Sequence, residues 1–252
     1  MNKWRLKWQK LAVLAIATCL SLSFSYCKVN SQAGLSPDLP PLKAHSLPEF
    51  FLQWQAQTTQ SDYFEQIEST PLGYLVWSQF PVKVYVEQTT ASEKSAANQR
   101  FQQWTATAKE AIAEWQVYFP FTEVTQPEAA DIMILRSQPK REVKLNPDTG
   151  LYDIPRAVAA QTNYEFYSTE NPTSIALRMT IQISPNFTGV SLLATVRHEL
   201  GHALGIWGHS PEKADALYFS QVSNPPTISP RDLNTLKKVY QQPTRLGWEM
   251  PN

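Results

Sequence analysis

The sequence is poor in cysteine and has no excess charge of either sign, and each shortage excludes a class of protein. Its 252 residues include only 2 cysteines, Cys19 and Cys27, so the chain after them has no thiol nucleophile, cysteine-bound zinc or disulfide. The 22 Lys and Arg residues balance 22 Asp and Glu residues, so the net charge gives no general argument for a nucleic acid as partner. No repeat of about 20–50 residues is visible, which excludes solenoids and propellers. We therefore expect a globular protein with no nucleic-acid partner.

The amino terminus has the pattern of an export signal. Residues 1–10 carry four basic and no acidic residues, and the uncharged, apolar stretch Leu11–Cys27 follows. We expect a signal peptide over residues 1–33, cleaved after Ala33; the competing interpretation is a retained signal anchor with its basic end inside. Cleavage would leave 17 basic against 22 acidic residues. The protein is expected to be extracellular or periplasmic, and attached to a membrane only if this segment is retained.

Residues 34–74 are interpreted as a Pro-rich linker or strap. Four prolines give residues 34–50 polyproline character. The stretch Phe50–Tyr74 is aromatic but irregular, and it is either a short pro-segment or a strap packed on the following domain. His45 is expected to be a surface or a hydrogen-bonded residue. Residues 75–252 are expected to form the domain that carries the chemistry.

Strand and helix patterns alternate in the rest of the chain. Strands are expected at residues 81–86, 121–125, 131–135, 157–167 and 175–184. Helices are expected at residues 92–119 and about 189–204, and a last helix starts at the capping residue Ser229 and stops before Pro243. A long charged loop is expected at residues 137–153. This order predicts an α/β fold with helices packed on a sheet.

Residues 198–209, HELGHALGIWGH, hold three of the four histidines of the chain. On a helix His198 and His202 are one turn apart, about 6 Å along the axis, so both can bind one zinc ion. Glu199 lies about 100° round the helix, where a carboxylate can take a proton from a metal-activated water. Gly205 suits a left-handed helix end, after which the chain can bring His209 back as a third ligand.

The segment His198–Ser210, HELGHALGIWGHS, resembles the zinc motif of the metzincin metalloendopeptidases, closest to the matrixin branch. The resemblance extends to the order of elements over about residues 75–244. It implies a zincin-like α/β fold: a twisted, mainly parallel five-stranded sheet with one antiparallel edge strand, here Ala157–Tyr167, a long helix, an active-site helix and a C-terminal helix. It also implies that a protein or peptide substrate pairs with the edge strand.

By the same resemblance, the ligands of a Zn²⁺ cofactor are His198, His202 and His209, and Glu199 is the general base. The chain departs from the family pattern at two positions. The third histidine is expected where this chain has Gly208, so His209 comes one residue late. A methionine is expected in the turn beneath the metal, where this chain has Leu217, which is close in volume.

The predicted function is an exported, monomeric, zinc-dependent endopeptidase. The alternative is an exported zinc-binding interaction module without turnover, which Leu217 and the longer loop to His209 leave open. Glu199 counts against it, because a structural zinc ion needs no such carboxylate. A helix with a fortuitous motif is a third interpretation. Latency through a pro-segment cysteine is excluded, Tyr218 is expected to pack rather than to hydrogen-bond in the cleft, and Asp148 and Asp153 are interpreted as solvated loop residues rather than calcium ligands.

Overall fold

The computed structural model describes residues 39–54, 61–90, 93–140, 144–145, 152–153, 159–170 and 173–251. The expected signal segment, both cysteines and Asp148 lie outside these residues, as does the side chain of Asp153. No helix within the described residues has the length and apolar character needed to cross a bilayer.

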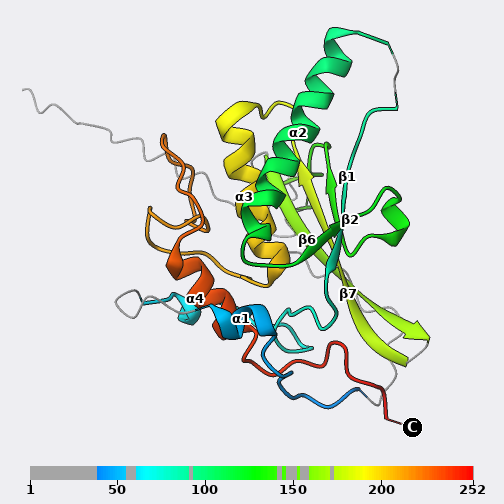
Figure 1. The fold of residues 1–252 in the computed structure, drawn as a ribbon, viewed down its shortest axis with the longest axis vertical. Helices are drawn as coiled ribbons and strands as arrows, with labels where there is room; N and C mark the ends of the chain where they lie inside the picture. Colours follow the sequence, from blue (N-terminus) through cyan, green and yellow to red (C-terminus); the bar gives the residue numbers. More distant parts are fainter. Residues whose placement is uncertain are drawn as a thin grey trace, which may run out of the picture.

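A mixed five-stranded sheet forms the centre of the molecule (Figure 1). Its strands are β1 (Val82–Val86), β2 (Phe121–Glu123), β3 (Ile132–Leu135), β6 (Ala160–Glu170) and β7 (Thr173–Ile183), in the order β2-β1-β3-β7-β6. Four strands are parallel, and β6 pairs antiparallel with β7 at one edge. This confirms the predicted mainly parallel sheet with an antiparallel edge strand.

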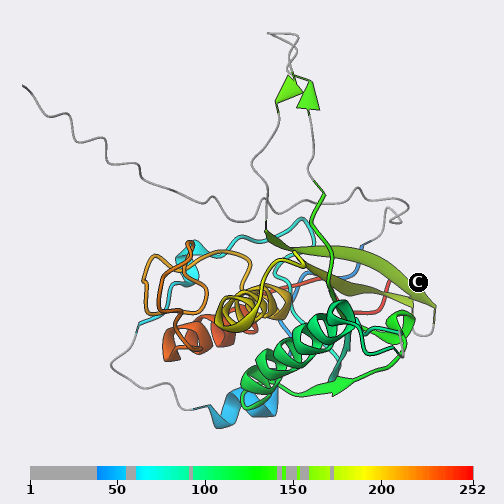
Figure 2. The ribbon, with the colours of Figure 1, turned by 90° about the horizontal axis from the view of Figure 1, so that it is seen from above.

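Two long helices, α2 (Ala96–Gln116) and α3 (Gly189–Leu204), lie side by side on one face of this sheet (Figures 1 and 2). Apolar residues three and four apart along α2 form one stripe, which is mostly buried and includes Trp104 and Trp115. The indole N–H of Trp115 donates to the carbonyl oxygen of Arg197 at 2.9 Å and so joins the two helices. Because α3 carries the histidine motif, these contacts fix the motif relative to the sheet.

Several element boundaries differ from the prediction. Helix α2 begins at Ala96 instead of residue 92, because the Ser95 hydroxyl accepts the N–H of Asn98 and caps the helix there. The edge strand runs from residue 160 to 170, so the boundaries 157–167 were wrong at its carboxyl end. The expected loop at 137–153 contains two short antiparallel strands, β4 (Lys144–Leu145) and β5 (Tyr152–Asp153), which extend away from the main sheet (Figure 2).

The C-terminal helix α4 (Pro230–Val239) starts as predicted. The Ser229 side chain accepts the N–H of Asp232, and the Asp232 side chain accepts the N–H of Ser229. Residues 61–74 are the last part of the segment 34–74 that was expected to be a linker or strap, and from here on only residues 61–74 are called the strap. They pack beside α4 and contain a short 3-10 helix, η1 (Phe64–Gln66). Tyr63, Ile67 and Leu72 of the strap are buried in the common core.

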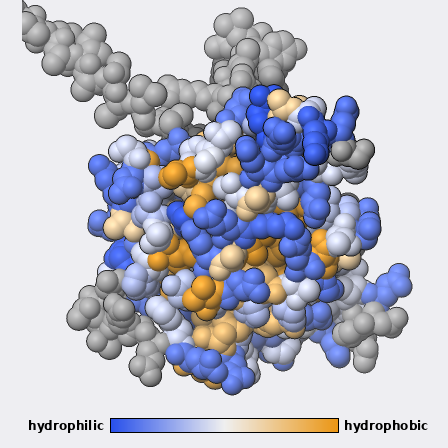
Figure 3. Space-filling model, turned by 45° about the horizontal axis from the view of Figure 1, so that its top comes forward, coloured by the Kyte–Doolittle hydropathy of each residue, from blue (hydrophilic) through white to orange (hydrophobic). Residues whose placement is uncertain are grey.

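A short helix, α1 (Glu49–Gln53), packs Phe51 against Tyr240 at the end of α4, with ring centres 5.0 Å apart. Before it, Lys43 forms a β-bridge with Thr244 of the carboxyl-terminal segment. The ring of His45 stacks on Trp248 with the ring centres 4.0 Å apart, and its Nε2 hydrogen-bonds with the carbonyl oxygen of Leu246 at 2.7 Å. His45 is therefore the hydrogen-bonded residue expected from the sequence. One face of the molecule shows hydrophobic residues interspersed with hydrophilic ones (Figure 3).

Candidate active site

The three histidines of the sequence motif meet at the end of α3. Helix geometry brings the Nε2 atoms of His198 and His202 to 3.1 Å from each other. The ring of His209 lies 5.3 Å from the ring of His198 and 4.8 Å from that of His202, measured between centres. One ring nitrogen from each histidine lies within 4.8 Å of the others. The arrangement is that of a three-histidine metal site.

Two glycines let the chain return from α3 to bring His209 to this place. Gly205 ends the helix with φ +123°, and a Cβ there would lie 2.3 Å from the carbonyl oxygen of Leu75. Gly208 forms a β-bridge with Ile67 of the strap, and a Cβ there would lie 2.0 Å from the carbonyl oxygen of Gln66. The loop before His209, which is one residue longer than in the family pattern, thus packs closely against the strap.

Backbone carbonyls orient the first two histidines. Nδ1 of His198 hydrogen-bonds with the carbonyl oxygen of Ala216 at 2.8 Å, and Nδ1 of His202 with that of Ile206 at 2.7 Å. Because a carbonyl oxygen can only accept, each Nδ1 carries the hydrogen and each Nε2 keeps a lone pair. Metal-binding histidines usually donate their second ring N–H to a carbonyl or carboxylate oxygen in this way, and the bond fixes both the tautomer and the ring orientation.

The histidine environment favours neutral rings, which are the form that binds a metal ion. Burial, with a contribution from His209, lowers the pKa of His198 to about 4. Burial and the two neighbouring histidines hold the pKa of His202 well below its usual value, and burial also lowers the pKa of His209. The lowered pKa values favour the neutral form of all three rings, in which Nε2 can offer a lone pair to a metal ion.

Glu199 is fully buried beside these rings, and burial raises the pKa of its carboxyl group to about 7. Its Oε2 accepts a hydrogen bond from the Thr162 hydroxyl of β6 at 2.7 Å, which favours the charged form. Its Oε1 and the Nε2 of His209 are buried and have no hydrogen-bond partner among the described residues. A metal ion and a water molecule at the histidines would supply what these two atoms lack, so the residues fit a catalytic metal.

The turn that follows the motif forms a floor under the site. Leu217 is fully buried against α3, so close that a Cβ at Gly201 would lie 2.5 Å from its Cδ2 atom. The carboxylate of Asp232 accepts the backbone N–H of Ala216 at 2.9 Å and holds the turn to α4. Asp215 is also fully buried and accepts hydroxyl hydrogen bonds from two serines. Thr162, Asp215 and Asp232 were not predicted as site residues. Thr162 is 37 residues from Glu199 and Asp232 is 16 residues from Ala216, so only the fold brings these pairs together. Asp215 is five residues from Ser210, but no pattern in the sequence marks this contact.

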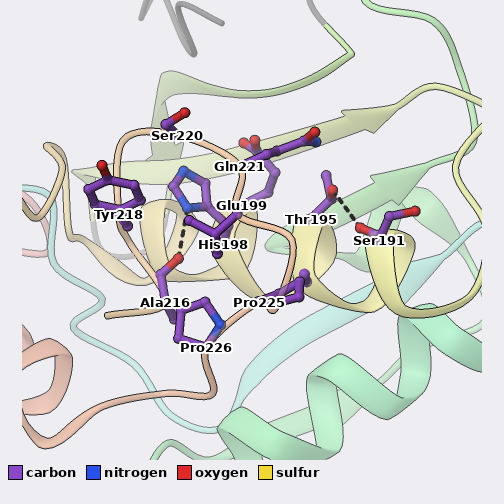
Figure 4. Close-up of a pocket in the computed structure, with 12 residues that line it drawn as sticks. Ser191, Thr195, His198, Glu199, Ala216, Tyr218, Ser220, Gln221, Pro225 and Pro226 are labelled. Atoms are coloured by element: carbon purple, nitrogen blue, oxygen red, sulfur yellow. Dashed lines mark hydrogen bonds between the residues drawn. The ribbon is translucent and has the colours of Figure 1, made fainter. Parts of the chain in front are cut away.

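A cavity of about 100 Å³ opens beside His198 between α3 and the chain at residues 216–226 (Figure 4). Tyr218 lines this cavity and packs against Phe219, with ring centres 4.5 Å apart. The far wall includes Pro226, whose carbonyl oxygen accepts from Nη1 of Arg197 at 2.7 Å. The same guanidinium group makes two hydrogen bonds of 2.6 and 2.7 Å to the carboxylate of Glu114 on α2. An ion pair outside the cavity therefore holds its wall.

Comparison with known proteins agrees with this geometry. The model of the Matrixin peptidase family matches residues 77–241, which include the sheet, α2, α3, the three histidines and α4. The match begins after the strap. A search of curated proteins gives no match.

Proposed function

Because the chain belongs to the matrixin family and is therefore a zinc metalloendopeptidase, we propose that His198, His202 and His209 are its zinc ligands and Glu199 its general base. The convergence of the three histidines, with one ring nitrogen of each within 4.8 Å of the others, carries this proposal. Tetrahedral zinc at about 2.05 Å from each nitrogen needs about 3.3 Å between ligand nitrogens, and the first pair stands at 3.1 Å. Three histidines leave a fourth position for the reaction, as catalytic zinc sites require.

When bound, zinc polarises the scissile carbonyl group and lowers the pKa of a water molecule. Glu199 takes the proton from that water through Oε1, while Thr162 holds Oε2 in place. The water oxygen adds to the carbonyl carbon, and the Glu199 carboxyl group then gives the proton to the amine nitrogen as the C–N bond breaks. The raised pKa of Glu199, a consequence of its burial, suits a group that must both accept and release a proton near neutral pH.

The substrate in this proposal is an extended stretch of a protein or peptide. The outer edge of β6 has no strand partner among the described residues, so a substrate can pair with it through backbone hydrogen bonds. One substrate side chain then enters the cavity beside His198. We propose that the enzyme works as a monomer, because the three histidines and Glu199 need no residue from a second copy of the chain.

The decisive variant is Glu199→Gln, which keeps the shape of the side chain but removes its basic oxygen. We expect it to retain zinc and to lose about 10²- to 10⁴-fold in kcat. The measurements are hydrolysis of casein or a peptide library, with and without chelator, and zinc content by elemental analysis. Glu110→Gln, at an exposed position of α2, is the matched control and should keep full activity. Full activity of Glu199→Gln would overturn the mechanism, and a zinc-loaded parent without hydrolysis would favour the binding module.

We also propose that the protein is exported and cleaved after Ala33. The support is the basic head and the apolar stretch Leu11–Cys27. Amino-terminal sequencing of protein recovered outside the cytoplasm should find Gly34 as the first residue. Recovery of the full chain in the membrane fraction would instead identify a retained anchor.

A further inference from the structure

The strap precedes the region that matches the family model, yet it supports the loop that carries the third histidine. Ile67 pairs with Gly208 in a β-bridge, and the N–H of Glu68 donates to the carbonyl oxygen of Trp207 at 2.9 Å. The lack of a side chain at Gly208 is what permits this approach, because a Cβ would meet the backbone of the strap. The backbone just before His209 therefore rests directly on the strap.

The strap also reaches the first histidine, through a chain of three hydrogen bonds. The Tyr63 hydroxyl donates to Oδ1 of Asp232 at 2.5 Å, and Oδ2 of Asp232 accepts the N–H of Ala216 at 2.9 Å. The carbonyl oxygen of Ala216 then accepts from Nδ1 of His198 at 2.8 Å. Tyr63 and Asp232 are both buried, so water does not compete for these bonds.

The position of the strap does not suit an inhibitory segment. An inhibitory segment has to fill or cover the cavity that receives the substrate. The residues that line the cavity beside His198 all lie between positions 191 and 226, and none belongs to the strap. The strap contacts residues 207–208, just before His209, and Asp232, and none of these residues lines the cavity. It can therefore support the site without blocking the cavity.

We propose that the strap is a positioning element of the zinc site and that Tyr63 is the positioning residue through which it acts on His198. The proposal rests on the proposed function only in taking the three histidines as zinc ligands. It predicts that this segment stays with the active enzyme, because its separation from the domain would weaken zinc binding instead of releasing activity.

The physical basis is the buried carboxylate of Asp232. Its Oδ2 accepts the backbone N–H groups of Ala216 and Ser229, and its Oδ1 accepts the Tyr63 hydroxyl and, at 3.4 Å, the N–H of Leu217. These bonds fix the floor turn relative to α4. Without the tyrosine hydroxyl, Oδ1 loses its shortest hydrogen bond and the carboxylate can rotate. The Ala216 carbonyl moves with the turn, and His198 loses its fixed orientation. Mutation of a residue that hydrogen-bonds to a metal ligand typically weakens metal binding by about 10- to 100-fold. We expect a loss near the lower end of this range for Tyr63, because it acts on His198 through two further groups.

The test is Tyr63→Phe in the full chain, with the zinc dissociation constant measured by chelator competition. We expect about 10-fold weaker binding. Tyr74→Phe is the matched control, because it makes the same change in the strap at a hydroxyl group with no hydrogen bond within the described part of the chain. Cobalt(II) substituted for zinc gives a second readout, since its visible absorption reports ligand geometry; the spectrum should change in Tyr63→Phe and stay as in the parent in Tyr74→Phe.

Two further variants separate positioning from loss of stability. Ile175→Val destabilises the core at the far end of β7, away from the histidines, and should leave zinc affinity unchanged. In an Asp232→Asn background, Tyr63→Phe should cause no further loss of zinc affinity if the tyrosine acts through Asp232. Equal zinc affinity in Tyr63→Phe and Tyr74→Phe, or faster peptide hydrolysis by Tyr63→Phe, would overturn the proposal. Both measurements of metal binding stand even if the parent proves not to cleave peptides.

Discussion

Replacing Thr162 by valine tests whether the edge strand takes part in catalysis through Glu199. The substitution keeps the shape of the side chain and removes the hydroxyl that donates to Oε2 of Glu199 at 2.7 Å. A hydrogen bond to a charged group contributes about 1.5–3 kcal/mol, and the other carboxylate oxygen has no partner among the described residues to hold the group in place. Since about 1.4 kcal/mol corresponds to a factor of ten, kcat/KM should fall by about 10- to 150-fold.

The assay for this variant is hydrolysis of a fluorogenic peptide by zinc-loaded protein, with zinc content measured in parallel. Zinc content should equal that of the parent, because Thr162 contacts the general base and no histidine. Thr105→Val is the control, because the Thr105 hydroxyl on α2 donates to the carbonyl oxygen of Glu87 at 2.9 Å and to no residue of the site. If Thr162→Val keeps kcat/KM within about twofold of the parent, the hydroxyl does not orient the base and the reasoning is refuted.

Two further predictions concern metal binding and the helix end. His202→Ala should abolish stoichiometric zinc, as measured by elemental analysis, whereas His45→Ala should retain it because His45 lies with the carboxyl-terminal segment. Gly205→Ala should lower the free energy of unfolding in urea by at least about 2 kcal/mol, because φ is +123° and the new methyl group would meet the carbonyl oxygen of Leu75. Gly189→Ala, also at positive φ but with open space around it, should cost less; equal losses would show that the contact with Leu75 does not matter.

The parts of the fold that were predictable are those with a local signal. Alternating apolar residues at 81–86 and the apolar stripe of the first helix each describe one element, and the structure shows both. The helix start at Ser229 was also predictable, because the capping serine and the proline after it are neighbours in the sequence. The start of the first helix was predicted at residue 92 from its apolar spacing alone, and the cap at Ser95, which accepts the N–H of Asn98, places it at Ala96.

In the candidate site, too, the residues with a local signal were predicted and those without one were not. The histidine motif specifies its own geometry, because helix periodicity and a glycine break place three rings within one short segment. The groups that support it do not: Thr162 is 37 residues from Glu199, and Tyr63 is 169 residues from Asp232. Nothing near either residue indicates its partner, since the pairing depends on how the sheet, α4 and the strap pack together.

The ion pair between Arg197 and Glu114 links the substrate preference of this protein to a residue outside the cavity. The same guanidinium group donates a hydrogen bond to the Pro226 carbonyl oxygen. Glu114 on α2 therefore sets the position of one cavity wall through Arg197. Exchange of that acid can alter which peptides are accepted while every residue in contact with the peptide stays the same. Two relatives with identical clefts can therefore differ in substrate preference, and the difference is to be sought on the second helix.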